Sequence, residues 1–62
     1  MEYKERLLEE LMALITKIAK LENFLKNANL ENKEKTELMS KQLDVMMAYR
    51  EILAKRVLLE ME

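Results

Sequence analysis

Apolar residues recur along the first half of the chain at alternating spacings of four and three residues. The pattern holds over three heptads, through Leu7, Leu11, Leu14, Ile18, Leu21, Leu25 and Ala28. Such spacing places apolar side chains along one side of an α-helix, as in the seam of a coiled coil. Because the chain contains no glycine and no proline, no helix breaker interrupts this pattern. The sequence therefore predicts a first helix over about residues 2–27.

A short stretch rich in asparagine follows this seam. Three of the four asparagines lie within residues 27–32. Asparagine tolerates the left-handed conformation, so Asn27 or Asn29 is expected to end the first helix in that conformation. Asn32 is the predicted N-cap of a second helix, with Glu34 in its first turn. We therefore expect a turn over about residues 28–32.

The second helix is predicted over about residues 33–61, and its apolar residues form two neighbouring rows. One row contains Met39, Leu43, Met46, Leu53 and Val57, and the other contains Leu38, Val45, Tyr49, Ile52 and Leu59. At about 100° per residue the two rows cover roughly 200° of the helix circumference, about twice what a core-facing helix needs. One antiparallel partner helix cannot cover so wide a face.

The predicted fold is all-α, with residues 1–62 forming a single antiparallel two-helix hairpin. Folding the chain about Leu30 pairs positions whose numbers sum to roughly 60. Leu7 should then face Leu53, and Leu14 should face Met46.

A hairpin of this size needs further support, because ordering 62 residues costs on the order of 90 kcal/mol. Disulfides and zinc clips are excluded, since the chain contains no cysteine and no histidine. We therefore expect a homo-oligomeric helical bundle, most simply a four-helix dimer. Its predicted interface residues are Leu38, Val45, Ile52 and Leu59.

Composition excludes several classes of function. The 11 basic and 12 acidic residues nearly balance, which argues against binding nucleic acid polymers. No apolar run approaches the roughly 18 residues of a membrane span and no signal peptide is visible, so we expect a cytoplasmic protein. The adjacent carboxylates Glu9 and Glu10 diverge by about 100° on a helix, and Ser40 has no imidazole partner. We therefore expect no catalytic residue, no metal site and no cofactor.

Tyrosine and arginine side chains are the candidate ligand-binding groups. An aromatic ring stacks on a base, and a guanidinium binds a phosphate through two hydrogen bonds. Hairpin pairing brings Tyr3 and Arg6 near Arg56, which defines one candidate nucleotide-binding corner. Tyr49 and Arg50, together with Gln42, define a second corner along the second helix.

A purely structural interpretation of the same residues remains open. Arginines at the edge of a helical seam commonly pair with glutamates such as Glu10 or Glu60. Tyr49 can bury its ring and leave its hydroxyl at the rim. Gln42 can fix the register and the oligomeric state.

Two stretches of the chain carry a resemblance to known proteins. They are Lys20-Leu21-Glu22-x-Phe24-Leu25 and Gln42-Leu43-x-x-Met46-x-x-Tyr49-x-x-x-Leu53-x-x-Arg56. This pattern resembles a group of small helical hairpins encoded by tailed and crAss-like phages. That group is similar in size and shape to phage sponges, which counter CBASS and Thoeris defence by sequestering cyclic nucleotide signals between protomers. The resemblance implies a noncatalytic binding protein in the host cytoplasm, and Tyr3, Arg6, Tyr49 and Arg56 fit its ligand-binding roles.

Two other functions remain open. The wide apolar face of the second helix and the outlying Met47 and Leu58 suit a module that inhibits a host defence enzyme by docking on it. A structural homo-oligomer of a phage is the third possibility. A nucleotide titration and a pulldown from host lysate separate these alternatives.

Overall fold

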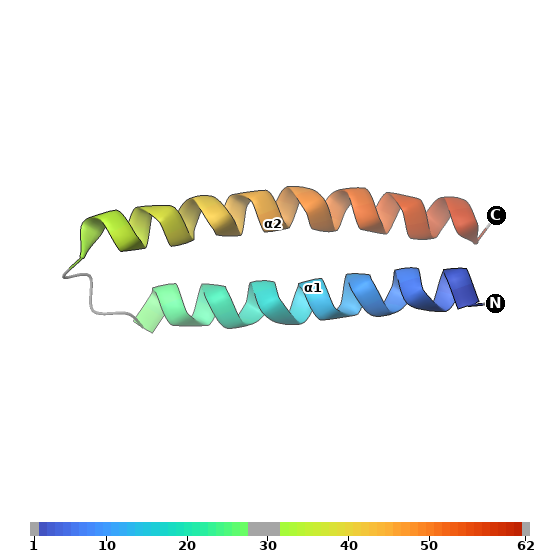
Figure 1. Cartoon of the computed structure of the whole chain (residues 1–62), viewed down its shortest axis with the longest axis horizontal. Coiled ribbons are helices and arrows are strands. Elements are labelled where there is room, and N and C mark those ends of the chain that lie inside the picture. Colours follow the sequence, from blue (N-terminus) through green and yellow to red (C-terminus); the bar gives the residue numbers. More distant parts are fainter. Residues whose placement is uncertain (1, 28–31, 62) are drawn as a thin grey trace.

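The structure, a computed structural model, describes residues 2–27 and 32–61, which form two long helices. Helix α1 spans Glu2–Asn27 and helix α2 spans Lys33–Glu60. They lie antiparallel and side by side, so the start of α1 and the end of α2 meet at one end, the open end of the hairpin (Figure 1). The molecule is a rod of 47 × 15 × 13 Å. The predicted all-α hairpin is confirmed, whereas its assembly with further copies stays a prediction.

The end of α1 differs from the expectation for Asn27. This residue is the last of the helix, and its Nδ2 donates a hydrogen bond of 2.9 Å to the carbonyl oxygen of Asn23. No non-glycine residue in the described ranges has a positive φ, so the left-handed role expected of Asn27 is wrong. The alternative, Asn29, and positions 28–31 of the expected turn lie outside the described residues.

The start of α2 is the one predicted. Asn32 has extended backbone angles, φ −106° and ψ 96°, and its Oδ1 accepts a 3.0 Å hydrogen bond from the backbone N–H of Lys35. This bond satisfies one of the amide groups that a helix leaves unpaired at its first turn. The N-cap prediction is therefore confirmed.

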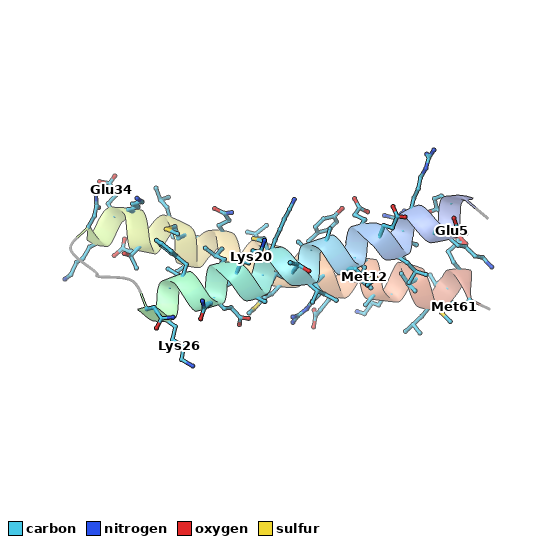
Figure 2. All side chains as sticks on the ribbon, turned by 90° about the horizontal axis from the view of Figure 1, so that it is seen from below. Glu5, Met12, Lys20, Lys26, Glu34 and Met61 are labelled. Atoms are coloured by element: carbon cyan, nitrogen blue, oxygen red, sulfur yellow. The ribbon has the colours of Figure 1, made fainter. Side chains whose placement is uncertain are left out.

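The core of the hairpin is a narrow strip between the two helices. Its buried residues are Leu7, Leu14, Ile18, Leu53 and Val57. Leu11, Leu43, Met46 and Met47 pack against this strip and are half-buried. All of these buried residues except Ile18 lie in the half of the rod near the open end. The side chains that project outward along both helices are mainly polar or charged, though apolar ones such as Met12 and Met61 are among them (Figure 2).

One row of α2 remains outside the core. We call Leu38, Val45, Ile52 and Leu59 the outer row, and Leu43, Met46, Leu53 and Val57 the inner row. The outer-row side chains are 62%, 68%, 56% and 68% exposed, respectively. The expectation that α1 alone cannot cover the apolar face of α2 is therefore confirmed. None of the helices among the described residues is long and apolar enough to span a membrane.

Candidate ligand-binding site

Two hydrogen bonds between side chains join the helices on one side of the rod. Nη2 of Arg56 donates to the hydroxyl oxygen of Tyr3 at 2.9 Å. The hydroxyl of Tyr49 donates to Oε1 of Glu10 at 2.8 Å. Both pairs have residue numbers that sum to 59, one less than expected, and they are seven residues apart on each helix. This repeat places polar residues in register along the hairpin.

On α2 this repeat defines a polar row made of Gln42, Tyr49 and Arg56. Each member lies three or four residues from members of both the inner and the outer row. Residues at these separations are neighbours on a helix surface, so the polar row runs between the two apolar rows. The amide of Gln42 contacts Sδ of Met46 at 3.8 Å.

The polar row borders a cleft at the open end of the hairpin. Tyr3, Arg6, Leu7, Glu10 and Arg56 line this cleft, which has a volume of about 310 Å³. Small-molecule sites commonly occupy roughly 300–1,000 Å³, so the cleft lies at the lower end of that range. The structure thus brings together the first candidate corner, Tyr3 with Arg6 and Arg56.

The electrostatics of the cleft follow from these hydrogen bonds. The bond to the Glu10 carboxylate raises the pKa of the Tyr49 phenol above its usual value of 10.0, and partial burial and the charge of Glu10 add to this. The hydrogen bond to Tyr3 raises the pKa of Arg56, which keeps the guanidinium charged. A guanidinium has five N–H donors, and the bond to Tyr3 uses one of them. Arg56 therefore retains donors for a phosphate.

Glu10 is the residue of this site that sequence reasoning missed. The sequence alone indicates it only as a possible partner for arginine and as a carboxylate that diverges from Glu9. The signal that locates it is the seven-residue spacing of Tyr3 and Glu10 on α1, which matches the spacing of Arg56 and Tyr49 on α2. Glu10 lines the cleft and accepts the hydrogen bond from Tyr49. Of the four expected aromatic and cationic groups, Tyr3, Arg6 and Arg56 line the cleft, and Tyr49 is joined to it through Glu10.

The second candidate corner is not assembled in the single chain. Arg50 is half-buried and does not line the cleft. It lies seven residues before the buried Val57, and therefore on the same side of α2 as that residue. Gln42 is fourteen residues from Arg56, which is about 21 Å along the helix. Of the three residues expected there, only Tyr49 is connected to the cleft. Among the described residues, no three acidic side chains form a group that could hold a metal ion.

The fold and the cleft define a small helical hairpin whose site offers aromatic rings, guanidinium groups and one carboxylate. A model of the Sequestin family matches residues 1–59, which include all of α1 and nearly all of α2. The chain belongs to the Sequestin family, whose name describes a sequestering, and hence binding, role. Searches of curated proteins and of solved structures each gave no significant match.

Proposed function

We propose that this protein sequesters a cyclic nucleotide immune signal without converting it, as a phage counter-defence protein in the host cytoplasm. The observation that carries the proposal is the convergence of Tyr3, Arg6 and Arg56 on one cleft. The family name supports a sequestering role, and the resemblance to phage sponges supports the class of ligand.

The chemistry of the cleft favours a nucleotide over a simple phosphate. The two guanidinium groups can bind phosphate oxygens in pairs of hydrogen bonds, and the ring of Tyr3, 53% exposed, can stack on a base. The Glu10 carboxylate repels bare phosphate but accepts hydrogen bonds from a base N–H or a ribose hydroxyl. A ligand that carries both phosphates and such donors satisfies all these groups.

The cleft is open to solvent and small for a cyclic dinucleotide. Its lining side chains, apart from Leu7, are exposed. Tight sequestration requires most of a ligand's surface to be covered, as is typical of small-molecule sites. We therefore propose that the ligand is held between protomers, with a second copy closing the cleft.

Calorimetric titration with a panel of cyclic di- and trinucleotides tests this function. We expect binding of at least one member, and Arg56→Ala should weaken it about tenfold or more, since a hydrogen bond to a charged group contributes roughly 1.5–3 kcal/mol. The matched control is Lys55→Ala, which removes a neighbouring exposed cation that does not line the cleft. Tyr3→Phe keeps the stacking ring and removes only the hydroxyl. The absence of heat and of thermal shifts across the panel would end the proposal.

A second function is favoured by a separate observation. Leu8, Met12 and Ile15 on α1 are 43%, 66% and 45% exposed, and Leu58 on α2 is 65% exposed. Such apolar surface suits docking on a host defence enzyme. Met47, expected to contribute to this surface, instead packs against the core. A stoichiometric protein captured from host lysate, lost on Met12→Glu, would support this alternative.

A further inference from the structure

The outer row of α2 is an apolar strip that α1 leaves uncovered. Its four members recur at intervals of seven residues, and each is more than half exposed. Seven-residue repeats keep side chains on one line only when two helices wind around each other, as in a coiled coil. The regular spacing therefore points to another helix of similar length as the occupant of this strip.

The exposed area of the hairpin matches the need for such a partner. The single chain exposes 5323 Å², whereas a compact monomer of its mass, 7.4 kDa, exposes about 4,200 Å². The excess of about 1,100 Å² is comparable to the roughly 800 Å² that each subunit buries in a standard stable interface. A second copy of this chain supplies an identical strip of the required length.

The order of side chains in the outer row reads almost the same in both directions. Leucines stand at its two ends, and the β-branched Val45 and Ile52 stand in its middle. An inverted copy places Leu59 of the partner subunit opposite Leu38, and Ile52 of the partner subunit opposite Val45. All four members then meet an apolar counterpart. Antiparallel helix dipoles also attract each other, which favours the inverted arrangement.

The same arrangement decides where the polar rows lie. In an antiparallel pair the two-fold axis is perpendicular to both helices, so both polar rows lie on the same side of the α2 pair. In this register Gln42 of the partner subunit lies opposite Arg56, and the two Tyr49 side chains face each other. A parallel pair would instead set the polar row beside the row that contains Lys41 and Lys55, placing Arg56 next to a like charge.

We infer that a second copy packs antiparallel along the outer row of α2 and adds its Gln42 beside the Tyr3–Arg56 cleft. The self-association stands independently of the proposed function, whereas the ligand-binding role of Gln42 rests on it. The glutamine amide is both a donor and an acceptor, as reading the edge of a base requires. Each dimer then has two equivalent clefts, one toward each end.

Disulfide trapping tests the arrangement without any nucleotide, so its failure is distinct from a failure of the proposed function. The chain has no cysteine, so introduced thiols report only on their own positions. We expect Val45→Cys mixed with Ile52→Cys to give a cross-linked heterodimer under mild oxidation. Each variant alone should cross-link poorly, because its two thiols are offset by about 10 Å, beyond disulfide reach. Ser40→Cys, on the opposite side of α2, is the control that should stay uncross-linked.

Two results overturn the inference. Efficient cross-linking of each variant with itself would indicate a parallel pair, and cross-linking no greater than that of Ser40→Cys would remove the outer row as an interface.

Sedimentation of two matched variants provides a second measurement on the intact chain. Leu59→Glu and Leu58→Glu place the same charge at adjacent, similarly exposed positions, 68% and 65%, but only Leu59 belongs to the outer row. We expect Leu59→Glu to weaken self-association at least about thirtyfold, as at an interface hot spot, and Leu58→Glu to leave it within about threefold. Equal effects of the two variants, or a monomeric parent chain at micromolar concentration, would contradict the inference.

Discussion

The inner and outer rows of α2 are made of the same kinds of residue but have opposite surroundings. Leu53 in the inner row has no exposed surface, whereas Ile52, the residue before it, is 56% exposed. The difference arises because α1 covers one side of α2 and leaves the next side open. An apolar row on a helix therefore does not by itself tell whether the other helix of the same chain covers it.

The largest expected effect comes from emptying the inner row. Leu53→Ala should lower the free energy of unfolding by about 3 kcal/mol, because the truncated side chain leaves a cavity in a fully packed position. Urea unfolding followed by circular dichroism measures this loss. The matched variant is Leu59→Ala in the outer row, which should cost less than about 0.5 kcal/mol in the isolated hairpin.

Protein concentration sharpens this comparison. The cost of Leu59→Ala should grow as the concentration rises, because the outer row then becomes buried by a second copy. The loss from Leu53→Ala should remain large at every concentration. A loss from Leu59→Ala that equals that of Leu53→Ala at nanomolar concentration would mean that both rows are covered within one chain.

The cap of α2 lies outside both rows, and the expected effect there is smaller. Asn32→Ala should lower the free energy of unfolding by about 1 kcal/mol, because the backbone N–H of Lys35 loses its acceptor. Asn32→Gly is the matched control and should cost only a few tenths of a kcal/mol, since glycine is itself an acceptable N-cap. Thermal unfolding of the two variants separates these values. An alanine variant as stable as the parent would show that the cap contributes nothing.

The sequence predicted the features that depend on local spacing. The hairpin and the meeting of Tyr3 with Arg56 follow from heptad spacing and antiparallel register, and the cap at Asn32 follows from the preference of asparagine for that position. The role of Glu10 did not follow, because an isolated glutamate on a helix resembles any solvated charge. It becomes visible only when the register is known to one residue, since a shift of one position moves a side chain by about 100° around the helix.

The placement of Arg50 and Gln42 shows a different limit. Adjacent numbering grouped Arg50 with Tyr49, but neighbouring residues on a helix point in different directions. Arg50 is half-buried away from the cleft, while Gln42 lies about 21 Å from it along α2. Sequence patterns within one chain cannot place a residue whose counterpart belongs to another copy, which is the role inferred for Gln42.

The smallest expected effect concerns the polar row itself and appears at high pH. The hydrogen bond to Glu10 raises the pKa of Tyr49, so the folded protein holds this proton more tightly than the unfolded chain does. The stabilisation is therefore fully present below pH 10, the ordinary tyrosine value, and is lost as the pH rises through the raised pKa of the folded state. In a Tyr3→Phe background Tyr49 is the only tyrosine, and its ultraviolet absorbance reports its titration directly. We expect a midpoint above 10 that moves down toward 10 when Glu10→Ala is added, whereas Glu9→Ala, at the neighbouring exposed position, should leave it unchanged. A midpoint that ignores Glu10→Ala would mean that the bond joining Tyr49 to the cleft does not form in solution.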